Sequence, residues 1–249
     1  MLALAAAALA LAGCTSPSVG SGARTLTVYA AASMKATFTA LGQTFEASHP
    51  GVAVTLNFAG SQDLAQQIIQ GAPADVFASA NDATMKAVAD AGLASGAAHQ
   101  YATNRLSIAV PPDNPARITG FADLARPGVK VVVCAPAVPC GGATVTVEQA
   151  TGVTLEPVSE EQAVSDVLSK VQAGEADAGL VYVTDVRAAG SSVRGIDFPE
   201  AARAITTNSI VALTTGRQAA LGQAFVDLVL SADGQEVLTE AGFGKPAPS

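Results

Sequence analysis

The sequence predicts an α/β fold with mostly parallel sheets, and three features of the chain lead to that prediction. Strand-like segments alternate with helix-like segments along most of the chain. The run Lys130-Val131-Val132-Val133 is typical of a buried parallel strand. Twice near the start, an apolar strand runs directly into a serine that opens a helix, at Ser33 and at Ser61. Such junctions lie at the carboxyl ends of strands, where ligands bind in parallel sheets.

In the first part of the chain, three of the expected helices end at Pro50-Gly51, Gly71 and Gly92. In order, they are strand 25–31, helix 33–47, strand 52–58, helix 61–70, strand 75–79, helix 81–91 and strand 106–110.

In the second part, Gly174 ends a helix and helical segments close the chain. The expected elements are strand 130–133, helix 142–151, strand 154–158, helix 160–173, strand 178–182, strand 193–198, strand 204–214 and helices 217–230 and 233–241.

Composition excludes several classes of function. The chain has 249 residues, enough for one domain or for two small lobes. Its formal net charge of −8 argues against nucleic acid as a partner, because binding phosphates requires a basic face. The chain contains no Trp, which argues against a site where aromatic side chains stack on sugar rings. Charged residues make up only 14%, which argues against disorder.

The N-terminus has the character of an export signal. Residues 2–12 are all Leu or Ala, a run too short to span a membrane, and Gly13-Cys14 follows. Leu11-Ala12-Gly13-Cys14 resembles the bacterial lipobox, after which the cysteine becomes the lipidated first residue. We therefore expect a signal peptide at 1–13 and a lipidated tether at 14–24, with an ordinary secretory signal cleaved nearby as the alternative.

The other two cysteines are Cys134 and Cys140. An exported location permits a disulfide, and the five intervening residues can form a tight loop. We expect this disulfide; two buried free thiols are the alternative. No metal site is expected, because the two histidines, His49 and His99, lie far from these cysteines in sequence.

Helix N-termini carry unpaired backbone N–H groups and the positive end of the helix dipole. A serine hydroxyl beside each helix start adds a further donor. Two such starts that face each other form a site for a small anion without any Lys or Arg.

Several segments together resemble the periplasmic molybdate-binding proteins of bacterial ABC importers, which have the two-lobed type II periplasmic-binding-protein fold. The resemblance extends from about Leu26 to the C-terminus. The segments that carry it are Tyr29-Ala30-Ala31-Ala32-Ser33, Phe58-Ala59-Gly60-Ser61-Gln62-Asp63-Leu64-Ala65-Gln66-Gln67-Ile68, Gly71-Ala72-Pro73-Ala74-Asp75-Val76-Phe77-Ala78-Ser79-Ala80, Val138-Pro139-Cys140-Gly141 and Gly174-Glu175-Ala176-Asp177-Ala178-Gly179-Leu180-Val181-Tyr182.

The resemblance implies five ligand-binding residues. Ser33 and Ser61 would donate through hydroxyl and backbone N–H, Cys140 and Val164 through backbone N–H, and Tyr182 through its hydroxyl. A cysteine at the position of Cys140 departs from the family's usual small residue. The resemblance also implies that two lobes, 25–104 with 206–249 and 105–205, each a mostly parallel sheet flanked by helices, enclose the ligand between them.

Each of these residues also has a simpler interpretation. Ser33 and Ser61 could be plain N-caps, Tyr182 a tyrosine at the edge of the core, and Val164 a packing residue. Lys35 follows Ser33 closely, but a solvated surface lysine is expected there. Asp63 is expected to complement the helix dipole.

The function that follows is a lipoprotein, anchored through Cys14 on the outside of the membrane, that captures molybdate, and also tungstate, for an ABC permease. We expect a monomer with no cofactor and no catalytic residues. The alternatives are a binding protein for sulfate or another tetrahedral oxyanion, and an extracytoplasmic Ser/Cys enzyme. The enzyme is disfavoured because Phe58-Ala59-Gly60-Ser61-Gln62 lacks the Gly-x-Ser-x-Gly elbow and the cysteines lack Cys-x-x-Cys spacing.

Overall fold

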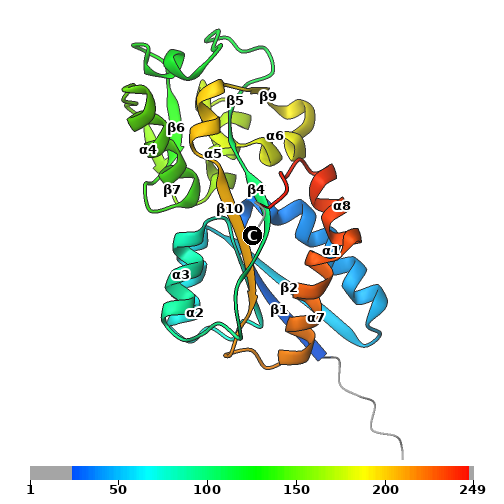
Figure 1. The fold of residues 1–249 in the computed structure, drawn as a ribbon. Helices are drawn as coiled ribbons and strands as arrows, with labels where there is room; N and C mark the ends of the chain where they lie inside the picture. The colour runs from blue at the N-terminus through cyan, green and yellow to red at the C-terminus, as the bar shows by residue number, and fades with distance from the viewer. Residues whose placement is uncertain (1–23, 247–249) are drawn as a thin grey trace, which may run out of the picture.

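A computed structural model describes residues 24–246 and contains two five-stranded sheets, each covered by helices. In Figure 1 one sheet lies above the other, and the chain passes between them along β4, β5 and β10. The first sheet with its helices is called the first lobe below, and the second sheet with its helices the second lobe. This is the two-lobed α/β architecture that the sequence predicts.

The first lobe has the strand order β2-β1-β3-β10-β4. The pairs β1–β2 and β1–β3 are parallel, whereas β10 is antiparallel to both β3 and β4. Its strands are β1 (Arg24–Ala31), β2 (Val52–Ala59), β3 (Val76–Ser79), β4 (His99–Asn104) and β10 (Thr206–Ala212). Its helices are the 3₁₀ turn η1 (Ala32–Met34), α1 (Lys35–Ser48), α2 (Ser61–Ile69), α3 (Asp82–Asp90), α7 (Ala219–Leu230) and α8 (Ala232–Glu240).

The second lobe has the order β7-β6-β8-β5-β9. Here β6 is parallel to β7 and β8, and β5 is antiparallel to β8 and β9. Its strands are β5 (Leu106–Val110), β6 (Val131–Cys134), β7 (Ser159–Glu161), β8 (Ala178–Tyr182) and β9 (Arg194–Ile196). Its helices are α4 (Pro139–Thr151), α5 (Val164–Gln172) and α6 (Val183–Ala189), with the 3₁₀ turns η2 (Phe121–Ala125), η3 (Gly190–Ser192) and η4 (Pro199–Arg203).

Each lobe has its own hydrophobic core. In the first lobe, Phe225 of α7 packs against Phe38 and Phe45 of α1, with ring centroids 5.9 and 5.4 Å apart. In the second lobe, β5, β6 and β8 are buried along their whole length, as expected for strands covered on both faces. The two sheets therefore have separate cores, and strand ends and helix starts of both lobes lie between them.

Apart from short 3₁₀ turns, one strand and one α-helix are missing from the sequence prediction. Strand β4, with the sequence His99-Gln100-Tyr101-Ala102-Thr103-Asn104, is too polar to resemble a strand and forms because β10 pairs with it. Helix α6 follows β8 without an intervening break, so no loop residue marks its start. Its first turn is fixed by Asp185, whose Oδ2 accepts the backbone N–H of Tyr182 at 2.8 Å.

Several predicted boundaries are wrong, all because tertiary pairing or caps decide them. The strand predicted at 154–158 lies instead at Ser159–Glu161, where it pairs with β6. The helix predicted to begin at 160 therefore begins at Val164. The helix predicted from 142 begins at Pro139, a residue favoured in the first turn of a helix. The strands expected at 193–198 and 204–214 shorten to Arg194–Ile196 and Thr206–Ala212.

Candidate functional site

A small cavity lies between the lobes, and all five residues expected to bind a ligand line it. Its volume is about 10 Å³. The lining combines strand ends and helix starts of both lobes: Ala31, Ala32, Ser33, Ala59, Gly60, Ser61 and Ala80 from the first, and Val138, Pro139, Cys140, Val164 and Tyr182 from the second. The tertiary structure thus brings Ser33 and Tyr182 to one cavity although they are 149 positions apart in the sequence.

The first lobe contributes the two serines from the first turns of helices. Ser33 lies in η1, directly before α1, and Ser61 is the first residue of α2. Neither serine is the N-cap: those positions belong to Ala31 and Gly60, and neither makes a side-chain cap bond. The interpretation of Ser33 and Ser61 as plain N-caps is therefore wrong, because the caps lie two residues before Ser33 and one before Ser61.

Both serine hydroxyls are free to donate a hydrogen bond to a group in the cavity. The Ser33 Oγ is buried and has no hydrogen-bond partner in the described part of the chain. The Ser61 Oγ accepts the backbone N–H of Ala80 at 3.1 Å. Because that bond occupies a lone pair of the oxygen, the Ser61 hydroxyl proton stays available for another acceptor.

Tyr182, the last residue of β8, offers a third hydroxyl. Its Oη is buried and unpartnered in residues 24–246. Burial raises the pKa of the Tyr182 phenol above its ordinary value, so the group remains a protonated donor at neutral pH. Orphaned buried donors are costly, and a ligand with acceptor oxygens would satisfy both Tyr182 and Ser33.

Asp185 is the residue near the site that sequence reasoning missed. Burial raises the pKa of the Asp185 carboxyl to about 7, although the hydrogen bond that it accepts from the Tyr182 backbone N–H acts to lower the pKa. The only sequence signal is an acidic residue three positions after the end of a strand, typical of the first turn of a helix. That signal was lost because helix α6 itself was not predicted.

The second lobe contributes two backbone N–H groups. Cys140 is the second residue of α4 and Val164 is the first residue of α5. The N–H groups in the first turn of a helix have no acceptor within the helix. Cys140 is joined to Cys134 at the end of β6, which confirms the predicted disulfide and links the start of α4 to the sheet.

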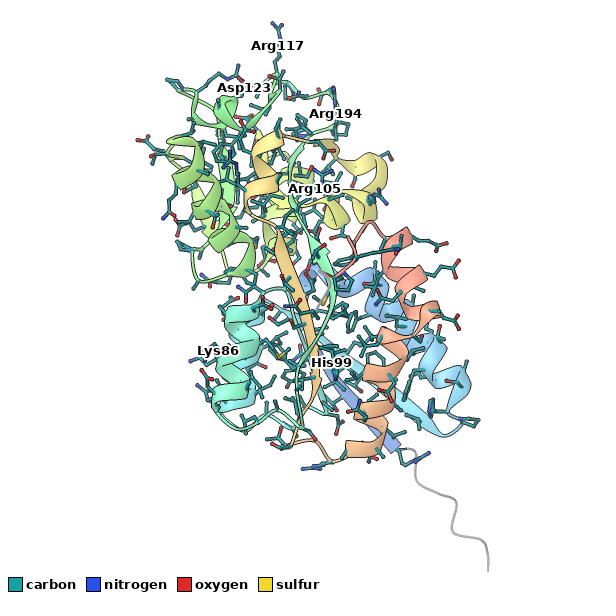
Figure 2. The ribbon with its side chains drawn as sticks, viewed as in Figure 1. Lys86, His99, Arg105, Arg117, Asp123 and Arg194 are labelled. Carbon is teal, nitrogen blue, oxygen red and sulfur yellow. A yellow bond between two sulfur atoms is a disulfide. The ribbon has the colours of Figure 1, made fainter. Side chains whose placement is uncertain are left out.

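No charged side chain is among the residues that line this cavity. Lys35 lines a different cavity, together with Arg187 and Glu240, and Asp63 lies in the first turn of α2, where it complements the helix dipole. Figure 2 shows Lys86 and Arg117 on the outer faces of their lobes, away from the junction between them. Within residues 24–246, no group of three or more His, Cys, Asp or Glu residues could hold a metal ion.

The arrangement suits an anion whose oxygens only accept hydrogen bonds. Hydroxyls and helix N-termini surround the cavity, and no carboxylate lines it to receive a proton from the ligand. Neither histidine lines the cavity, so Ser61 has no adjacent general base.

None of the helices in the described range is long and apolar enough to cross a membrane.

Comparison with known proteins decides the family. The family described as "Bacterial extracellular solute-binding protein" matches residues 26–244. The chain belongs to the bacterial extracellular solute-binding proteins. Among the curated members, a protein of Mycobacterium tuberculosis named "Molybdate-binding protein ModA" is 51% identical over 225 residues, which is 90% of this chain and 86% of that protein.

Solved structures show that this solute-binding protein shares its fold with two oxyanion-binding proteins. The periplasmic molybdate-binding protein of Azotobacter vinelandii aligns with a TM-score of 0.80 and 22% identity, over 89% of this chain and 100% of that one. The sulfate-binding protein SubI of Mycobacterium tuberculosis aligns with a TM-score of 0.81 and 18% identity, over 90% and 88%. Both matches concern the fold, which carries either kind of ligand.

Proposed function

We propose that this solute-binding protein captures molybdate, and also tungstate, outside the cytoplasmic membrane and delivers it to the permease of an ABC importer. The observation that carries the proposal is the convergence of Ser33, Ser61 and Tyr182 hydroxyls with the first turns of α4 and α5 on one uncharged cavity. The 51% identity to a molybdate-binding protein supports the choice of ligand.

The proposed chemistry is the holding of a dianion by neutral donors alone. Molybdate at neutral pH is fully deprotonated and tetrahedral, so its four oxygens act only as acceptors. Hydrogen bonds to an ionised acceptor contribute about 1.5–3 kcal/mol each, and exclusion of water by the two lobes strengthens them. In this proposal Ser33 and Ser61 donate through hydroxyl and N–H, Cys140 and Val164 through N–H, and Tyr182 through its hydroxyl.

The remaining parts of the proposal concern the chain around the site. Residues 25–104 and 206–249 form one lobe and 105–205 the other, with the hinge where the chain crosses between the sheets. The protein acts as a monomer without a cofactor and without enzymatic activity. Cys14 carries the lipid anchor; it lies outside the described residues, as do the signal peptide and the expected tether except for Arg24, which is the first residue of β1.

Calorimetric titration of the purified protein with molybdate, tungstate, sulfate and phosphate tests the ligand. We expect binding of molybdate and tungstate, with sulfate and phosphate much weaker. Sulfate has the same charge and shape as molybdate but shorter bonds. If the protein binds sulfate more tightly than molybdate, the ligand is sulfate, and the proposed set of donors still stands. For the anchor, we expect wild-type protein in the membrane fraction and Cys14→Ala protein outside it.

A further inference from the structure

One hydrogen bond joins the two lobes beside the cavity. The Gln62 side chain, on the first turn of α2, donates from Nε2 to the backbone carbonyl oxygen of Gln162 in the second lobe at 3.0 Å. Gln62 directly follows Ser61, and Gln162 lies two residues before Val164. The bond therefore connects two of the chain segments that line the cavity, one from each lobe.

Gly60 allows this contact. A Cβ atom at Gly60 would lie 2.2 Å from the Gln162 carbonyl oxygen and 2.5 Å from the Gln62 Nε2. The backbone of Gly60, at φ −59° and ψ 138°, is one that any L-residue adopts. Glycine is therefore not required here by its backbone angles, but by the close approach of the Gln162 carbonyl oxygen from the other lobe and of the Gln62 side chain that binds it.

Within residues 24–246, two other hydrogen bonds join the lobes, and both lie elsewhere. Asn104 Nδ2 donates to Thr184 Oγ1 at 2.9 Å, at the end of β4 where the chain crosses between the sheets. Arg187 Nη1 donates to the Glu240 carbonyl oxygen at the end of α8, at a longer 3.4 Å.

Ala32, beside Ser33, packs against the core of the second lobe, but this contact is apolar. Among the hydrogen bonds between the lobes in the described residues, the one from Gln62 to Gln162 therefore lies nearest to the proposed position of the ligand.

We propose that Gly60, Gln62 and the Gln162 carbonyl form a latch that closes the lobes over the ligand, and that Gln62 thereby sets the rate at which the ligand leaves. The proposal rests on the oxyanion-binding function proposed above. The latch bond exists only when the lobes are together, so it breaks on release but is not yet formed when ligand first enters. Its loss therefore raises the dissociation rate and leaves the association rate nearly unchanged.

The test compares Gln62→Met with Gln67→Met. Methionine keeps the length of the side chain and removes the amide donor, and Gln67 is an exposed residue of the same helix. For Gln62→Met we expect molybdate dissociation about 2- to 10-fold faster, with association changed by less than 2-fold. Gln67→Met should match the wild type in both rates. Equal dissociation rates for all three proteins contradict the latch.

Gly60→Ala provides a second test, with Gly142→Ala as its control. A Cβ at Gly142 would meet nothing closer than the Pro136 carbonyl oxygen at 3.6 Å, an ordinary contact. We expect Gly60→Ala to keep the wild-type melting temperature without ligand but to lose more than 10-fold in molybdate affinity. Wild-type affinity in Gly60→Ala shows that the lobes do not approach as closely as the latch requires.

A distance measurement separates failure of the latch from failure of the proposed ligand. Dyes on Lys86→Cys and Arg117→Cys, in protein carrying Cys14→Ser, report the separation of the lobes from their outer faces (Figure 2). Without any ligand, Gln62→Met and Gly60→Ala should populate the closed state less than wild type does. If wild type binds no molybdate, the function is wrong, and this ligand-free comparison still decides the latch: identical closed populations overturn it.

Discussion

The hydroxyl oxygen of Ser61 accepts a hydrogen bond from the backbone N–H of Ala80 at 3.1 Å, linking the start of α2 to the residue after β3. This bond fixes the orientation of the hydroxyl and leaves its proton free. Both residues line the cavity between the lobes. Ser61 is thus oriented as a donor before any ligand arrives, so little ordering is needed when an anion binds.

Ser61→Ala should weaken molybdate binding about 10- to 100-fold. The variant lacks one charge-assisted donor, a loss of about 1–3 kcal/mol, and it also leaves the Ala80 N–H without its partner. Titration calorimetry measures the change. Lys35→Ala is the comparison, because Lys35 lies outside the cavity and its exposed charge is screened by salt. Abolished binding in Lys35→Ala with normal binding in Ser61→Ala would falsify the neutral-donor mechanism.

Tyr182→Phe should lower affinity without lowering stability. The Tyr182 hydroxyl is buried with no partner in the described part of the chain, so its removal relieves an unsatisfied group in the free protein. With ligand bound, the same removal deletes a donor to an ionised acceptor, about 1.5–3 kcal/mol. Titration and urea unfolding measure the two effects separately.

Tyr29→Phe is the matched control, since Tyr29 is half-buried on β1 and does not line the cavity. We expect its affinity to equal that of the wild type. A Tyr182→Phe protein that is clearly less stable and binds normally would show that the hydroxyl serves the fold and not the ligand.

Loss of the Cys134–Cys140 disulfide should destabilise the second lobe and weaken binding together. The loop closed by the bond is short, with a sequence separation of 6, so the stabilisation should be near the low end of about 2–4 kcal/mol. Because the bond ties the first turn of α4 to β6, its loss should also loosen the Cys140 N–H. The double variant Cys134→Ser, Cys140→Ser, measured by urea unfolding and by titration, tests both effects. A thiol assay that finds both cysteines free in oxidised, denatured wild type contradicts the disulfide.

Asp185 should make stability depend on pH. Its pKa is about 7 in the folded protein, raised by burial from an ordinary 3.8. Between these values the folded protein binds more protons than the unfolded chain, so the free energy of unfolding falls as the pH rises, by at most about 1.4 kcal/mol per pH unit. Asp185→Asn removes this contribution and keeps an acceptor for the Tyr182 N–H.

Urea unfolding of both proteins between pH 4.5 and 7.5 measures the difference. We expect the stability of Asp185→Asn, relative to wild type, to rise steadily across this range. Parallel pH profiles would mean that Asp185 ionises at its ordinary pKa despite its burial.

Local sequence determined much of this protein. The alternation of strands and helices, the buried valines of β6 and the serines after β1 and β2 are each specified within a few neighbouring residues. Hydrophobic periodicity and helix start signals are local properties, so the α/β class and the positions of Ser33 and Ser61 could be predicted from them. Cys140, Val164 and Tyr182 were proposed through resemblance to a family, since nothing local distinguishes a backbone N–H at Val164 from any other.

Only the tertiary structure decided what depends on partners distant in sequence. Strand β4 exists because β10 pairs with it, and β7 is placed by its register with β6. The raised pKa of Asp185 and the orphaned hydroxyl of Tyr182 both follow from burial by other elements. The contact of Gln62 with Gln162 spans 100 residues and two lobes. The physical reason is the same in each case. Burial, strand register and close approach depend on how whole elements pack together, whereas helix capping and hydrophobic periodicity depend on a few neighbouring residues.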